Sequence, residues 1–84
     1  MARVTVKVFA TLIEIIGKRI FEEEASTVKE LLEKIYSQYP KVKEELEEGY
    51  MILINGHNIE HLQGLETPLK DGDVVSIFPP AGGG

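Results

Sequence analysis

The sequence predicts an α+β fold in which one main helix packs on one face of a small sheet. Apolar residues alternate with polar ones at Val4, Val6 and Val8, the period of a half-buried strand. Between residues 28 and 39 they recur at spacings of three and four, the period of an amphipathic helix. Two hairpin-like segments flank that helix, which can cover only one face of the sheet they form. A chain of 84 residues is expected to fold as one domain, which we assign to residues 1–80.

The N-terminal segment predicts a β-hairpin with a short helical turn in its connection. The alternating strand at Val4–Val8 is followed by "LIEIIGK", which suits a turn of helix broken at Gly17. A second strand is expected near Lys18–Glu23, as the hairpin partner of the first.

The main helix has a start signal and a stop signal. Thr27 and Glu30 form a capping-box pattern, in which the Thr27 hydroxyl accepts from the Glu30 backbone N–H and the Glu30 carboxylate reaches back to the cap. Pro40 ends the segment by disfavouring helical geometry at its predecessor. For the following "KVKEELEEG" we favour a solvated charged loop, with a short acidic helical turn as the alternative. The apolar stripe of the helix comprises Val28, Leu31, Leu32, Ile35, Tyr36 and Tyr39.

The C-terminal half predicts three more strands, one of them short. In "YMILINGHNI", the Asn55-Gly56 pair suits the positive φ angles of a two-residue type I′ hairpin turn. A turn at Asp71-Gly72-Asp73 then leads into a last strand at Val74–Phe78. Pro79 and Pro80 end that strand because they have no backbone N–H to donate.

The period of two divides the apolar strand residues between two faces of the sheet. Seven of them face the helix: Val4, Val6, Val8, Ile52, Ile54, Val75 and Ile77. The other face then receives Phe9, Leu53, Val74 and Phe78. We interpret these four as a docking patch for a protein partner, because contiguous exposed apolar groups often mark an interface. The alternative is that flanking loops bury some of them, or that the register differs.

Composition excludes several classes of function. The chain has no cysteine, so it has no disulfide, no thiolate metal site and no thiol nucleophile. A net charge of -5 disfavours nucleic acid and makes a basic partner surface the expected complement. No stretch reaches the ~20 apolar residues of a membrane helix, and the N-terminus lacks a signal-peptide pattern, so we expect a cytoplasmic protein with no membrane partner. His57 and His61 lack further ligands for a metal site and are expected on the surface.

The last residues, "PPAGGG", point to chemistry at the carboxyl end of the chain. Gly82, Gly83 and Gly84 have no side chain to pack, so we expect residues 81–84 to form a flexible tail. A frayed terminus is the alternative. Pro79 and Pro80 would hold such a tail clear of the sheet, and its carboxylate could then enter a narrow cleft of another enzyme. That enzyme could adenylate the carboxylate with ATP and so prepare it for attack by a nucleophile.

The pattern "NG…N…L.GL.TPLKDGD…FPP..GG" resembles the MoaD and ThiS group of ubiquitin-like sulfur carriers, and most closely the small subunit of molybdopterin synthase. The resemblance extends over nearly the whole chain, from "VKVFA" to the terminal glycines. It implies a ubiquitin-like β-grasp fold with a mixed sheet of four to five strands. It also implies that Gly84 is adenylated, converted to a thiocarboxylate, and used to supply sulfur to a pterin precursor. Such carriers dock their partners where this chain has Phe9, Leu53 and Phe78.

The same resemblance implies the partners. They are the large subunit of molybdopterin synthase and a ubiquitin-activating-like adenylyltransferase, which would use the ATP; the chain itself is expected to bind no cofactor and to catalyse nothing alone. A ubiquitin-like modifier joined through Gly84 to target lysines is the alternative function, because it shares the activation chemistry. Thiamine-type sulfur carriage is less favoured, since those carriers resemble a shorter chain without the acidic segment at Lys43–Glu48.

Overall fold

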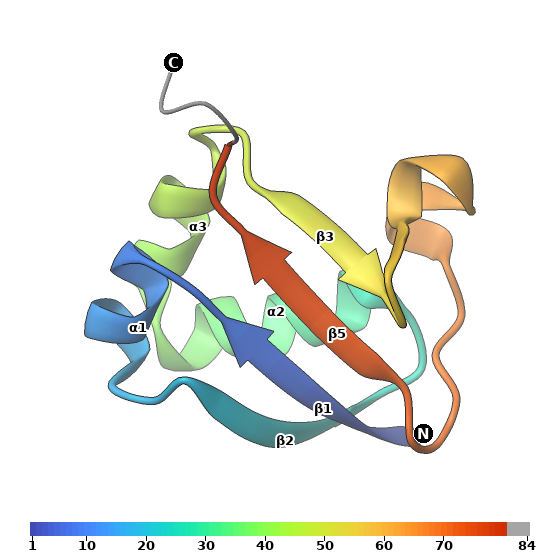
Figure 1. Cartoon of the computed structure of the whole chain (residues 1–84). Coiled ribbons are helices and arrows are strands. Elements are labelled where there is room, and N and C mark those ends of the chain that lie inside the picture. Colours follow the sequence, from blue (N-terminus) through green and yellow to red (C-terminus); the bar gives the residue numbers. More distant parts are fainter. Residues whose placement is uncertain (81–84) are drawn as a thin grey trace.

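The structure is a computed structural model that describes residues 1–80. It contains a five-stranded mixed sheet with strand order β2-β1-β5-β3-β4, and the longest helix, α2, lies across one face (Figure 1). β5 is parallel to β1 and antiparallel to β3. The strands are β1 (Ala2–Val8), β2 (Ile20–Ala25), β3 (Met51–Ile54), β4 (His57–Asn58) and β5 (Val74–Phe78). The helices are α1 (Thr11–Ile16), α2 (Val28–Gln38), α3 (Pro40–Leu46) and the 3-10 turns η1 (Ile59–His61) and η2 (Gly64–Glu66).

The predicted N-terminal hairpin is confirmed, with its second strand displaced toward the C-terminus. β1 and β2 pair from Ala2 opposite Ala25 to Lys7 opposite Ile20. α1 occupies the connection and ends at Gly17, whose φ of 84° is the left-handed conformation that glycine adopts readily. The residues directly after Gly17 complete this turn, so β2 begins at Ile20 and not at the predicted Lys18.

The capping box at the start of α2 is confirmed, with one difference. The Glu30 backbone N–H donates to the Thr27 hydroxyl oxygen at 3.2 Å. The Glu30 carboxylate accepts from the backbone N–H of Ser26, one residue before the predicted cap position. Four residues of the stripe are buried, and α2 ends at Gln38 as the proline signal predicts.

The favoured loop after Pro40 is wrong, because this segment forms the two-turn helix α3. Pro40 occupies its first turn, where the missing N–H costs nothing. Val42 is fully buried and Leu46, one helical turn later, is half-buried, so two apolar side chains anchor a segment that is otherwise charged. Glu44, Glu47 and Glu48 remain exposed, as predicted.

The Asn-Gly hairpin is confirmed, and Asn55 does more than turn the chain. Asn55 and Gly56 have φ angles of 50° and 87°, as a type I′ turn requires. The Asn55 amide nitrogen donates to the Asp73 carboxylate at 2.9 Å, and its amide oxygen accepts from the Val74 backbone N–H at 2.9 Å. One side chain therefore ties the β3–β4 turn to the start of β5.

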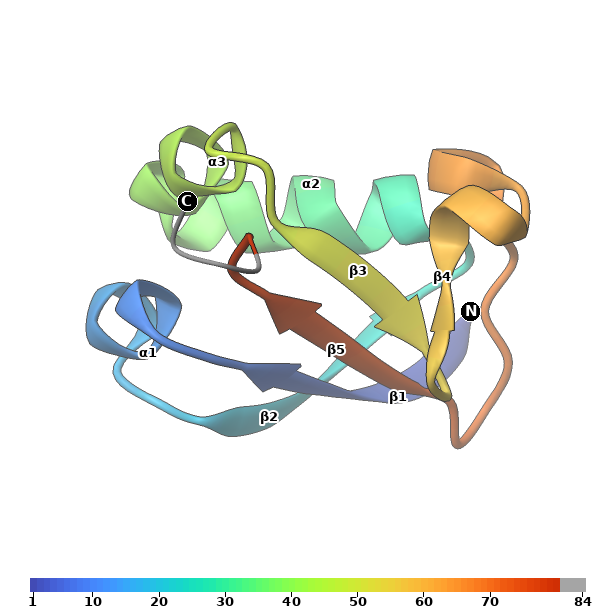
Figure 2. The ribbon, with the colours of Figure 1, turned by 45° about the horizontal axis from the view of Figure 1, so that its top comes forward.

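The core lies between the sheet and α2, and all seven residues predicted to face the helix are buried. Figure 2 shows α2 and α3 on the same side of the sheet, and none of the described helices crosses the other side. Residues 1–80 include no helix with the length and apolar composition needed to cross a bilayer.

Candidate functional site

An apolar patch lies on the sheet face opposite α2. Phe78 is paired with Met51, and Leu53 is paired with Ser76, the position between Val74 and Phe78 on β5. Leu53 is therefore a diagonal neighbour of both Val74 and Phe78, and the side chains form one continuous surface. We call Phe9, Met51, Leu53, Val74 and Phe78 the outer-face patch.

Every residue predicted for this face is accessible. Phe9, Leu53, Val74 and Phe78 are half-buried, and none is covered completely. The predicted register is confirmed, whereas the use of the patch for docking stays a prediction. Met51 was missed although it is 39% exposed, and its signal was available: Met51 and Leu53 alternate with the buried Ile52 and Ile54.

The rings of Phe9 and Phe78 stack on each other at the end of the sheet. Their centroids are 4.3 Å apart and their planes differ by 15°. Phe9 directly follows β1 and Phe78 ends β5, so the stack continues the parallel pairing of these strands by one further contact. The stack fixes both rings at the place where the C-terminal segment leaves the domain.

The other half of this sheet face is charged. The Arg3 guanidinium contacts the Glu22 carboxylate at 2.7 Å and the Glu24 carboxylate at 3.3 Å. The hydrogen bond to Glu22, more than the attraction of its charge, raises the pKa of Arg3 above its ordinary value. All three side chains are more than half exposed, so these ion pairs contribute little to stability. The apolar half therefore lies over β5 and β3, and the charged half over β1 and β2.

The predicted reactive residues Gly82, Gly83 and Gly84 lie outside the described residues, as does the proposed tail at 81–84. The structure does describe Pro79 and Pro80, which lead to them. Pro79 is half-buried and Pro80 is exposed, and both directly follow Phe78 of the outer-face patch. A partner that handled the C-terminal residues would therefore meet the patch at the base of the segment.

Tyr50 and Glu45 lie beside this exit and had no signal in the sequence. The Tyr50 hydroxyl donates to the Glu45 carboxylate at 2.7 Å. Burial and this hydrogen bond raise the pKa of Tyr50 to about 12, so its hydroxyl remains a donor at neutral pH. This contact joins α3 to the residue before β3, and it depends on a turn that no local pattern specifies.

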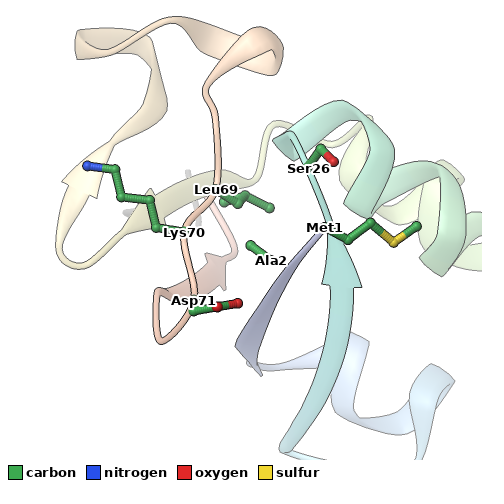
Figure 3. A pocket seen from close by; sticks show the side chains of 6 residues that line it. All are labelled: Met1, Ala2, Ser26, Leu69, Lys70 and Asp71. Carbon is green, nitrogen blue, oxygen red and sulfur yellow. The ribbon is translucent and has the colours of Figure 1, made fainter.

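The hollow beside the N-terminus does not have the features of a catalytic site. It has a volume of about 220 Å³ and is lined by Met1, Ala2, Ser26, Leu69, Lys70 and Asp71 (Figure 3). Figure 3 shows the Lys70 and Met1 side chains pointing in opposite directions. The Asp71 carboxylate already accepts from the Arg3 backbone N–H at 2.8 Å. The polar groups that line the hollow thus do not converge on a common point, as binding of a ligand would require.

Nor does the described part of the chain bring together a metal site. No group of three His, Asp or Glu residues within it is placed to hold an ion. His57 and His61 are both exposed, as predicted. The outer-face patch and the adjacent exit of the C-terminal segment are thus the candidate site.

Known proteins are similar to this chain in both sequence and fold. The model of the ThiS family matches residues 6–84. Small archaeal modifier protein 3 from Haloferax volcanii is 35% identical over 85 residues, covering 90% of this chain and 92% of that protein. The solution structure of small archaeal modifier protein 1 from Methanosarcina acetivorans has a TM-score of 0.89 and 40% identity, and the match covers 100% of this chain and 98% of that one.

A third match is a chain in the complex of subunits 1 and 2 of molybdopterin-converting factor from Helicobacter pylori. It is 36% identical with a TM-score of 0.69, and the match covers 98% of this chain and 99% of that chain. The ubiquitin-like β-grasp fold and the resemblance stated from the sequence motifs are both confirmed by these matches.

Proposed function

This chain belongs to the ThiS family, and from that premise we propose that it is a sulfur carrier whose reacting group is the carboxylate of Gly84. We propose further that it acts as the small subunit of a molybdopterin synthase in molybdenum or tungsten cofactor synthesis. It would then be a substrate and a subunit, and would catalyse nothing by itself. The single observation that carries the proposal is the continuity of the outer-face patch with the exit of the C-terminal segment at Phe78, Pro79 and Pro80.

The chemistry requires two steps at one carbonyl carbon. A Gly84 carboxylate oxygen attacks the α-phosphorus of ATP, pyrophosphate leaves, and an acyl adenylate forms. A hydrosulfide equivalent then attacks the carbonyl carbon, AMP leaves, and a thiocarboxylate remains. The chain has no cysteine to carry sulfur, so the terminal carbonyl is the position available for it. A ubiquitin-activating-like adenylyltransferase in the cytoplasm would bind the ATP.

The proposed partner of the outer-face patch is the large synthase subunit. The patch is apolar and fixed by the Phe9–Phe78 stack, which suits an interface core. The similar chain from Helicobacter pylori is in a complex of subunits 1 and 2 of molybdopterin-converting factor, which supports a partner of this class. Sulfur would pass to the pterin precursor in a pocket of that subunit.

A second candidate function is that of a ubiquitin-like modifier. Small archaeal modifier proteins are among the matched proteins, and the two described above align over nearly the whole of this chain. The adenylate would be the same, but a lysine amine of a target protein would attack it in place of sulfur. An amide bond to the target would result.

Intact mass spectrometry separates the two functions. The purified chain is incubated with its adenylyltransferase, ATP and sulfide, with and without a cell extract as a source of targets. A gain of about 16 Da, one oxygen replaced by sulfur, supports the carrier. Lysine adducts that carry a glycine remnant support the modifier. The starting mass also tests whether Gly84 bears the free carboxylate.

Deletion of Gly83 and Gly84 is the control for the same assay. We expect it to abolish pyrophosphate release and leave the unfolding midpoint unchanged, because glycine contributes no side chain to the core. Normal turnover by this shortened chain would contradict a reacting group at Gly84.

A further inference from the structure

The direction in which the chain leaves the sheet is not set by the strand ladder. β5 is paired with β1 as far as Ile77 and with β3 as far as Phe78. Pro79 and Pro80 follow, and neither has a backbone N–H with which to extend either ladder. Contacts outside the ladder are therefore what remains to position these two residues.

The nearest segment is the turn at Gly49 and Tyr50. The last pair of the β3–β5 ladder is Met51 opposite Phe78, so Tyr50 precedes β3 at the end of the sheet where Pro79 follows β5. A Cβ position built on Gly49 lies 3.9 Å from Cγ of Pro80, which shows that the two segments are in contact. Gly49 has a φ of 107°, a conformation that suits glycine and sets the path of the chain between α3 and β3.

A side-chain contact holds the chain at Gly49 and Tyr50, which we call the corner between α3 and β3. The Tyr50 ring is half-buried and packs against the core, and its hydroxyl donates to the Glu45 carboxylate at 2.7 Å. Glu45 lies in α3, so the bond spans the Gly49 turn and fixes the corner from both sides. A hydrogen bond to an ionised acceptor is stronger than one between neutral groups. The Tyr50–Glu45 bond therefore holds the turn whose Gly49 contacts Pro80.

We propose that Tyr50 is a positioning residue for the C-terminal segment: held by Glu45, it fixes the direction in which Pro79 and Pro80 leave the sheet. In its functional part this rests on the proposed function, because the direction determines how readily Gly84 enters the site of the activating enzyme. Tyr50 touches no reacting atom; it acts through the path of the turn at Gly49, which contacts Pro80.

The test uses Tyr50→Phe in the full chain, which removes only the hydroxyl. Carbon-detected NMR, which does not need an amide proton, reads the chemical shifts of Pro79 and Pro80 directly. We expect both sets of shifts to change, and the KM of the chain in adenylation to rise about three- to tenfold with kcat unchanged. The value of kcat persists because the bound segment takes the same position in the enzyme once it has entered.

Matched variants separate positioning from a loss of folding. Glu45→Gln keeps an acceptor but removes its charge and should give a smaller effect than Glu45→Ala, which should reproduce the effect of Tyr50→Phe. Tyr39→Phe makes the same chemical change at the other end of α3 and should leave the shifts of Pro79 and Pro80 unchanged. Thermal unfolding shows whether each variant is folded at the assay temperature.

The proposal would be overturned if Tyr50→Phe left the chemical shifts of Pro79 and Pro80 unchanged. It would also be overturned if Tyr39→Phe changed them as much as Tyr50→Phe does. A parallel fall in kcat and in the folded fraction would assign Tyr50 a purely structural role and overturn it as well. If the wild-type chain is not adenylated at all, the proposed function fails. The proline shifts still decide whether Tyr50 directs the segment.

Discussion

Phe78 combines three properties that no other residue of the sheet shares. It stacks on Phe9, lies opposite Met51 in the outer-face patch, and directly precedes the two prolines. A rigid aromatic ring in the middle of an apolar surface is the usual form of an interface anchor. The energetic consequences of its removal should therefore appear in binding as well as in folding.

Phe78→Ala should weaken binding to the proposed partner, the large synthase subunit, by about 1 to 3 kcal/mol, because truncation removes the anchor and leaves its cavity in the partner unfilled. Isothermal titration calorimetry with the purified subunit measures the loss. Leu65→Ala is the matched control, since Leu65 is 48% exposed on η2, outside the patch. Equal affinities for wild type and Phe78→Ala would remove Phe78 from the interface.

Ala10, between β1 and α1, has a strained backbone conformation. It follows Phe9 and has a φ of 57°, which is unfavourable for a residue with a Cβ. Ala10→Gly should raise the free energy of unfolding by about 1 kcal/mol by relieving that strain. Urea denaturation measures the change. Ala25→Gly, in a buried strand position, is expected to have the opposite sign. A destabilised Ala10→Gly would show that the strain is negligible.

The sequence predicted correctly which face of the sheet each assigned strand residue occupies, because the period of two along a strand is enough to decide this. The inward and outward positions of β1, β3 and β5 follow from alternation alone, and the outward set needed only the addition of Met51. The Tyr50–Glu45 contact could not be predicted, because it joins side chains across a turn whose path depends on Gly49. No periodicity records such a contact.

At the scale of elements, local signals located the ends of α2 and the β3–β4 turn. Each rests on short-range chemistry: a hydroxyl cap at Thr27, a proline after the helix, and positive φ angles at Asn55 and Gly56. α3 was missed because five of its seven residues are a proline or charged, and its stability comes from the burial of Val42. Burial of that kind depends on neighbours distant in sequence.

The cap of α2 can be tested directly. Thr27→Ala should lower the free energy of unfolding by about 1 kcal/mol, because the Glu30 backbone N–H loses its acceptor. Urea denaturation at neutral pH gives the value. Thr27→Ser keeps the hydroxyl and should retain most of the stability. A loss as large in the serine variant would attribute the effect to the methyl group of threonine and contradict the capping argument.

For the molecule as a whole, charge is expected to govern the rate of association more than its strength. The net charge is -5, and α3 and its following turn expose Glu44, Glu47 and Glu48, ahead of Gly49, which contacts Pro80. A basic partner surface would be attracted over a distance that salt shortens. The short-range contacts of the apolar patch would be affected much less.

Raising the ionic strength from about 0.05 M to about 0.5 M should therefore lower the association rate constant with the large subunit about tenfold and change the dissociation rate little. Stopped-flow measurements give both rates. The Glu47→Gln and Glu48→Gln double variant should show a weaker dependence on salt. An association rate independent of salt would mean that the partner surface is not basic.

The central place of β5 has a consequence for biosynthesis. This strand enters between β1 and β3, so the first and last strands of residues 1–80 are neighbours and the sheet remains in two parts until β5 is added (Figure 1). The ribosome must have translated Val74–Phe78 before the sheet can close. A product that stopped short of Val74 would lack both the scaffold and the proposed reactive glycines, and could not compete with the finished protein for its partners.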